Sequence, residues 1–392
     1  MCLKNLKRVG EHTFSCLIAT IDLVTDCING LELLGYINSD FIRNNEEKSV
    51  EKIWGSLSLF IVFLPGTLIA IPQVLESLLG KQYQDAIFAF FLMLIFPLLF
   101  PAFQVIKIMQ ILISSDRLNK TMEKIDPYLV SWVGAEAYYE SFPQLVLQLY
   151  ILLNGYNVTK IQIGSILFSV VTITNTSMRT DIEMRCHIKN MPRTCTENIK
   201  ERITNLPCYL STIAFRAVSF ALTIAYLREV SIGTNLFLLM ILAIISFKRV
   251  NCRSNGEDKF SDAANYCFTN FGVMSVHGLG LDTEENENGK RRQDEEDPTA
   301  ITKFIRYSNL FSFIHHIAVL AIIMLLGYFK IWKYLEFFEY LEDDQLLLKP
   351  KTPTFYWMFS TTILMGCYSN NLLFYREKKL VDYPDKSNKL LT

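Results

Sequence analysis

The sequence predicts an all-α polytopic membrane protein of about eight transmembrane helices, with further helices that enter the bilayer without fully crossing it. Of its 392 residues, 51% are hydrophobic, and they gather in long uninterrupted runs rather than in short periodic stretches. Runs of about 18 or more apolar residues are typical of membrane-spanning helices. No segment has the pattern of a strand, and helices satisfy their own backbone hydrogen bonds, as lipid requires.

Nine apolar segments are candidates for membrane helices. They lie near 12–36, 54–76, 85–113, 128–153, 160–178, 209–228, 232–247, 309–328 and 354–374. The third is longer than a bilayer requires and contains Pro97 and Pro101. These prolines predict a kinked or strongly tilted helix.

Basic residues set the expected orientation, because they favour the cytosolic side. Such residues lie before the first segment, at 4–8, and after the last, at 376–379. We therefore expect both termini in the cytosol. The connections after the fifth and seventh segments are also rich in basic residues and should be cytosolic. Nine full crossings cannot satisfy these constraints, so one segment must enter and leave on the same face. We expect this of 128–153, the most polar segment.

Residues 1–380 are expected to form a single transmembrane domain, followed by a cytosolic tail at 381–392. Within the domain, the charged stretch 281–298 predicts a disordered cytosolic loop. The net charge of −1 gives no reason to expect a nucleic acid partner. Nine cysteines without a CxxC pair indicate neither a zinc site nor a redox site, so no metal or cofactor is expected.

The first segment carries two carboxylates within an apolar run. Asp22 and Asp26 are four residues apart, so they share one helix face, which Asn29 continues. A charged side chain at mid-bilayer costs about 2.5–3.5 kcal/mol on insertion scales and usually faces protein or water. Two interpretations stay open: a structural ion pair with a basic residue elsewhere, or the lining of a transport pathway.

The fourth segment carries a polar stripe. Glu136, Glu140, Gln144 and Gln148 recur every four residues along it, and Pro143 interrupts the helix. Such a stripe favours a groove or cavity over a lipid-facing position. The alternative is a buried network that holds helices together, in which each hydrogen bond contributes roughly 1 kcal/mol or less.

The sixth segment contributes a basic group, Arg216, with no acidic neighbour on its face. It either pairs with one of the carboxylates above or contacts phosphate, whose geometry a guanidinium matches bidentately. His315 and His316 lie in an apolar run without a metal-binding motif, which favours a core or cavity role. No nucleotide-binding, kinase or hydrolase motif is present, so an enzyme is not expected.

Acidic and basic groups along one groove suit a zwitterionic lipid headgroup, with phosphate near arginine and the amine or choline near carboxylates. Two stretches also match a known family. Residues 136–152, EAYYESFPQLVLQLYIL, resemble the signature of the XK-related family, and IDLVTDCINGLELLGY in the first segment resembles its opening helix. The segment around Arg216 is similar to the arginine-containing helix of that family.

The resemblance implies a plasma-membrane protein of about eight crossings that scrambles phospholipids without an energy source. Several family members expose phosphatidylserine during apoptosis after caspase cleavage of a cytosolic tail. In scramblase members, intramembrane acidic and arginine residues form a polar path for headgroups. The corresponding lipid-path candidates here are Asp22, Asp26, Glu136, Glu140, Gln144 and Arg216.

The remaining expectations concern how the protein is activated and which partners it binds. Asp382 and Asp385 have the Asp-x-x-Asp form of a caspase site, although Lys386 follows where caspases prefer a small residue. Expected partners are phospholipids, a single-span membrane protein or a lipid-transfer protein, and a second copy of the chain. Two alternatives stay open: a receptor that docks a lipid-transfer protein through the 179–207 loop, and a solute transporter or channel that uses the carboxylates as a relay.

Overall fold

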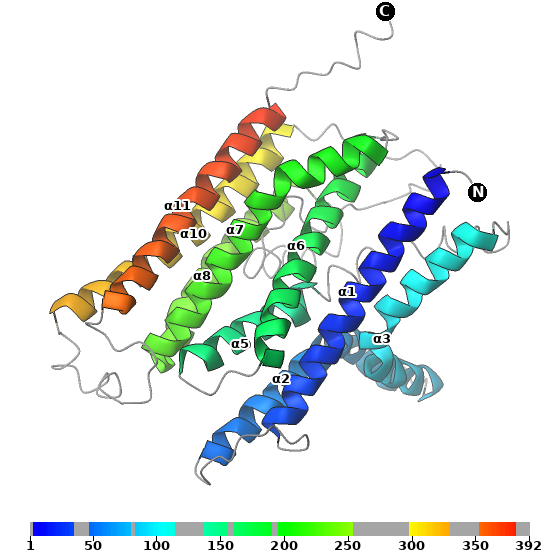
Figure 1. The fold of residues 1–392 in the computed structure, drawn as a ribbon, viewed down its shortest axis with the longest axis horizontal. Coiled ribbons are helices and arrows are strands. Elements are labelled where there is room, and N and C mark those ends of the chain that lie inside the picture. Colours follow the sequence, from blue (N-terminus) through cyan, green and yellow to red (C-terminus); the bar gives the residue numbers. More distant parts are fainter. Residues whose placement is uncertain are drawn as a thin grey trace, which may run out of the picture. The chain divides into compact units, whose positions relative to one another are not determined.

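A computed structural model of the chain shows only helices in the residues that it describes (Figure 1). The described residues are 3–34, 47–79, 83–113, 137–154, 160–189, 195–253, 298–329 and 353–381. The helices are α1 (Leu3–Leu33), α2 (Glu47–Leu79), α3 (Tyr83–Ile113), η1 (Ala137–Ser141), α5 (Phe142–Leu153), α6 (Lys160–Lys189), α7 (Cys195–Leu227), α8 (Glu229–Arg253), α10 (Pro298–Phe329) and α11 (Pro353–Val381). The described part of each of the nine predicted segments is therefore helical, whereas the number of full crossings stays a prediction.

Two stretches of these helices are long and apolar enough to cross a membrane, Asn205–Leu227 of α7 and Asn309–Phe329 of α10. The whole helices have 33 and 32 residues, which is roughly 50 Å at 1.5 Å per residue. This length exceeds the hydrocarbon thickness of about 30 Å, so part of each helix extends beyond the apolar layer. In α7 the charged N-terminal part provides such an extension.

The chain divides into two compact units. The first comprises residues 1–148 and 157–176, and in it α1, α2 and α3 pack against one another while η1 contacts α2. The second comprises residues 149–156 and 177–392, and in it α7 packs against α8, α10 and α11. The expectation of a single transmembrane domain stays a prediction.

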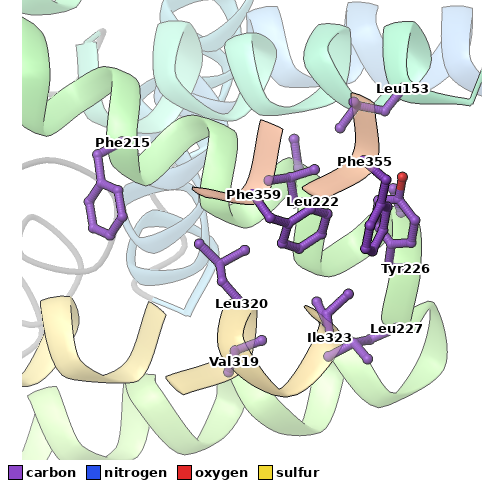
Figure 2. Close-up of a cluster of buried hydrophobic side chains, with 12 residues drawn as sticks. Leu153, Phe215, Leu222, Tyr226, Leu227, Val319, Leu320, Ile323, Phe355 and Phe359 are labelled. Atoms are coloured by element: carbon purple, nitrogen blue, oxygen red, sulfur yellow. The ribbon is translucent and has the colours of Figure 1, made fainter. Parts of the chain in front are cut away.

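An aromatic and aliphatic core holds the second unit together, as Figure 2 shows. Tyr226 of α7 packs edge-on against Phe355 and Phe359 of α11, with ring centroids 5.3 and 5.4 Å apart. Leu320 and Ile323 of α10 complete the contact. Burying side chains of this size between three helices fixes their relative positions within the unit.

Many large apolar side chains of the described helices are exposed, and many polar side chains are buried. On α8 the exposed large side chains are Ile232, Leu236, Phe237, Met240 and Ile244, which follow one face of the helix. The buried residues include carboxylates, amides, an arginine and many hydroxyls. Soluble proteins rarely expose contiguous apolar surface of this kind, whereas a lipid-facing helix requires it.

Two helices of the first unit approach closely at glycines. A Cβ atom on Gly55 of α2 would lie 2.7 Å from the carbonyl oxygen of Gly30 on α1 and 2.9 Å from the amide nitrogen of Leu34. Both neighbours are backbone atoms, so a side chain could be accommodated only by moving one helix away from the other. Small residues at such contacts are typical of membrane helix interfaces.

This contact predicts the effect of a single methyl group. We expect Gly55→Ala to lower the free energy of unfolding by about 1–3 kcal/mol, as overpacking does. Gly164→Ala on α6 is the matched control, because a Cβ there meets nothing within 4 Å, and we expect it to be neutral or slightly stabilising. Thermal unfolding of both variants in detergent micelles is the measurement. Equal stability of the two variants would contradict the close approach.

Candidate functional site

Asp22 and Asp26 of α1 lie at the centre of a buried polar cluster in the first unit. Their exposed fractions are only 4% and 1%. Because the two positions are one helical turn apart, both carboxylates face the same neighbours. The structure thus confirms that they share a face, and it places that face in the protein interior.

Two serine hydroxyls donate hydrogen bonds to Asp22. Ser169 Oγ of α6 lies 3.0 Å from Asp22 Oδ1, and Ser141 Oγ of η1 lies 3.2 Å from Asp22 Oδ2. All three residues are buried. Each carboxylate oxygen of Asp22 therefore accepts a hydrogen bond from a different element.

Asp26 is bound in the same way by two other residues of the same two segments. Gln148 Nε2 of α5 donates to Asp26 Oδ1 at 3.0 Å, and the hydroxyl of Ser165 on α6 donates to the same oxygen. Gln148 Nε2 also lies 2.6 Å from Ser165 Oγ. The three side chains form a closed triangle that ties α1 to α5 and α6.

These pairs fix the directions of the three segments. Asp22 meets Ser169 and Asp26 meets Ser165, so α1 and α6 run antiparallel. Asp22 meets Ser141 and Asp26 meets Gln148, so η1 and α5 run parallel to α1. These are the directions expected if the fourth predicted segment returns to the face from which it entered, whereas strict alternation of nine crossings would make α6 parallel to α1.

The polar stripe of the fourth predicted segment contributes to the same cluster. Glu140 is 4% exposed, and Gln144 and Gln148 are completely buried or nearly so. The amide of Gln144 donates to the Ser58 hydroxyl on α2. The first residue of the stripe, Glu136, lies outside the described residues.

A change of helical winding occurs where Pro143 was expected to interrupt the helix. The π-helical turn η1 ends at Ser141, and the α-helix α5 begins at the next residue. Proline supplies no N–H to the preceding turn, which is consistent with this change of winding.

The serines were not among the predicted site residues. Ser165 and Ser169 are separated by the same four residues as the two aspartates, which is the signal that could have indicated them. Single hydroxyls in apolar helices are common, however, and they usually bond to their own backbone. Only the register between α1 and α6 distinguishes these two from the others.

Arg216 lies in the second unit, on α7, and is 3% exposed. Its Nη2 atom donates to Asn309 Oδ1 of α10 at 2.8 Å. This amide partner was not expected from the sequence, which suggested a carboxylate or phosphate. Of the predicted lipid-path residues, Asp22, Asp26, Glu140 and Gln144 are all buried and belong to the first unit.

His316 lies in the core, which is one of the two roles expected of it, a core or a cavity role. Its ring packs edge-on against Phe220, with centroids 4.7 Å apart, and against Phe215, with centroids 5.8 Å apart. His315 lies beside Phe237 of α8. The predicted caspase residues Asp382 and Asp385, like the loop 281–297, lie outside the described residues.

Comparison with known proteins identifies one family. The model of the family described as XK-related protein matches residues 47–276, which is more than half of the chain. The matched range contains η1, α5, α6 and Arg216 but not Asp22, Asp26 or Asn309. No protein with a curated description matches the chain.

The triangle around Asp26 predicts that removing one buried hydroxyl, that of Ser165, lowers stability more than removing an exposed one. Ser165→Ala removes a donor to Asp26 and a neighbour of Gln148 at once, so we expect it to lower the free energy of unfolding by about 1–2 kcal/mol. Ser56→Ala is the control, because its exposed hydroxyl bonds to Lys52 of its own helix, and its effect should stay within about 0.5 kcal/mol. The comparison uses thermal unfolding in detergent. A Ser165→Ala variant as stable as the control would show that the triangle is not formed.

Proposed function

Because the chain belongs to the XK-related family of membrane proteins, we propose that it moves phospholipids between the two leaflets of the plasma membrane without an energy source. The exposure of phosphatidylserine during apoptosis is the biological setting proposed for this activity. The observation that carries the proposal is the cluster around Asp22 and Asp26, which is polar and charged inside helices whose outer faces are apolar.

The chemistry of the cluster suits a lipid headgroup. Serine and glutamine donors satisfy the two carboxylates in the described structure. The ammonium group of phosphatidylserine or phosphatidylethanolamine carries N–H donors of its own and a positive charge, so it can replace these donors at Asp22 and Asp26. The acyl chains would remain among the apolar faces while the headgroup passes.

The buried state of the carboxylates corresponds to a closed path in this proposal. Headgroup entry requires the hydrogen bonds of Asp22 to Ser169 and of Asp26 to Ser165 to break as α1 separates from α6. Each of these bonds is worth about 0.6 kcal/mol in a membrane protein, so breaking them costs little free energy. Removal of the tail by a caspase, which would cut after Asp385 in the Asp382-Tyr-Pro-Asp385 motif, is the activating step that we propose for this separation.

The direct test is reconstitution of the purified chain in vesicles with fluorescent phospholipids. We expect lipid movement above the rate in empty vesicles after residues 386–392 are removed. Replacing both Asp22 and Asp26 with asparagine should slow it at least about tenfold, since about 1.4 kcal/mol of lost attraction corresponds to that factor. Glu32→Gln, further along α1, is the control for loss of an acid on the same helix.

Three outcomes are informative. Movement by the chain without residues 386–392 that is no faster than in empty vesicles, with the protein folded, would reject lipid transport and favour a receptor for a lipid-transfer protein. Solute flux or current that the aspartate variants abolish, with lipid distribution unchanged, would favour a solute transporter. Equal scrambling by the double variant and the Glu32→Gln control would exclude the aspartates from the path.

A further inference from the structure

The contacts within the second unit fix the directions of its long helices α7, α8, α10 and α11. Arg216 of α7 donates to Asn309 of α10. Further along both helices, Phe220 of α7 packs on His316 of α10. The two helices therefore run parallel, and their first turns lie at the same end of the unit.

The helix α11 runs in the opposite direction. Near the end of α7, Tyr226 packs on Phe355 in the first turn of α11. Closer to the start of α7, Phe215 lies against Gly366, where an added Cβ atom would be 2.5 Å from its ring. Positions thus rise along α7 as they fall along α11. The last turns of α11 therefore lie at the same end as the first turns of α10, as Figure 1 shows.

The helix α8 folds back along α7. It begins directly after Arg228, whose φ of 41° is left-handed. Its Phe237 lies beside His315 of α10, with ring centroids 6.5 Å apart. The next residue of α10, His316, packs on Phe220 of α7. Phe237 is therefore level with a residue well before the end of α7, so α8 runs antiparallel to α7.

The end of this unit at which α7 and α10 start and α8 and α11 finish is basic. It comprises residues 195–205, 247–253, 298–308 and 370–381, which we call the basic end. Its lysines and arginines are Lys200, Arg202, Lys248, Arg249, Arg253, Lys303, Arg306, Arg376, Lys378 and Lys379. Its acidic residues are Glu197, Glu201 and Glu377. At the opposite end of the same helices, the described charged residues are Arg228 and Glu229, whose charges balance.

The basic residues begin at the depth of lipid headgroups. From Arg228, α8 reaches Lys248 after about 30 Å at 1.5 Å per residue. From Phe355, α11 reaches Arg376 after about 32 Å. The hydrocarbon core of a bilayer is about 30 Å thick, so both positions lie where the headgroups begin. The exposed apolar face of α8 also ends at Ile244, one turn before Lys248.

Lys248 and Lys303 belong to different helices but lie at one level. Lys248 is about 17 Å beyond Phe237 along α8, at 1.5 Å per residue. Lys303 is about 18 Å before His315 along α10. Because Phe237 and His315 are neighbours and the two helices run antiparallel, the two lysine positions share one depth. The fold thus brings basic positions from separate helices to the same membrane depth.

The excess of basic residues predicts that this end faces the cytosol. The cytosolic leaflet carries phosphatidylserine and phosphoinositides, and clusters of about four to eight Lys and Arg beside membrane helices are typical binding sites for these anionic lipids. We propose that the basic end binds the phosphate groups of anionic lipids in that leaflet, with Lys248 and Lys303 among the residues that hold them. The inference does not rest on the proposed function, because a headgroup bound at this depth stays on its own side of the membrane.

The experiment measures lipid binding by the full-length chain in a non-ionic detergent. The probes are dioctanoyl phosphatidylinositol bisphosphate, dioctanoyl phosphatidylserine and zwitterionic dioctanoyl phosphatidylcholine, and thermophoresis gives the apparent dissociation constant of each. We expect the wild type to bind an anionic probe more tightly than phosphatidylcholine. Raising the salt concentration should weaken the binding of the anionic probe, because salt screens exposed charges.

Two double variants locate the binding to the basic end. Lys248→Gln with Lys303→Gln should weaken binding of the anionic probe at least about tenfold, since two basic residues near an anionic surface together contribute that much. Lys4→Gln with Lys7→Gln is the matched control, because it removes the same charge from α1 in the first unit, and it should bind as the wild type does. Lys248→Arg with Lys303→Arg keeps the charge and should also bind as the wild type does.

The probes distinguish the sources of the phosphate. Tight binding of the inositol bisphosphate alone supports a phosphoinositide site, and tight binding of both anionic probes supports a site for anionic lipids in general. Equal affinity for all three probes would overturn the inference. Equal binding by the glutamine variant at positions 248 and 303 and by the variant at positions 4 and 7 would also overturn it, as would equal loss in the arginine and glutamine variants.

Discussion

The hydrogen bonding of two carboxylates inside apolar helices is the constraint on which the first unit depends. Burying Asp22 and Asp26 costs about 5–7 kcal/mol for the pair at mid-bilayer. The hydrogen bonds that they accept from serine and glutamine side chains contribute about 0.6 kcal/mol each. Together these bonds offset less than half of the cost of burial. Stability therefore does not explain why the carboxylates are there, and the proposed path for polar headgroups would give them a role.

The same bonds determine how α1 is held. Matching four-residue spacings on α1 and α6 let both aspartates find a serine when the helices run antiparallel, and a shift of one residue would separate both pairs. Close contact between Gly30 and Gly55 holds α1 against α2 one turn beyond Asp26. In consequence, α1 is fixed by short-range contacts that depend on register.

The sequence was sufficient to predict the helices and part of the site. Apolar runs located the segments, and the spacing of the two aspartates placed them on one face, because both signals are local. The hydroxyl partners Ser165 and Ser169 could not be predicted, since a serine in an apolar helix has the same appearance whether it bonds to its own backbone or to another helix. Asn309 could not be predicted for a similar reason. Charge complementarity suggests an acidic partner for Arg216, whereas the packing of α7 on α10 provides an amide.

The central claim is that lipid headgroups reach the aspartates when the protein is active. A single thiol introduced by Ser169→Cys, in a chain without other cysteines, would test it with a phospholipid whose headgroup carries a maleimide. In vesicles in which the protein scrambles lipid, we expect the thiol at position 169 to be modified. A thiol introduced instead by Leu145→Cys, in the apolar interior of α5, should remain unmodified. Scrambling at the full rate while the thiol at position 169 stays unmodified, or reacts no faster than the one at position 145, would contradict the account.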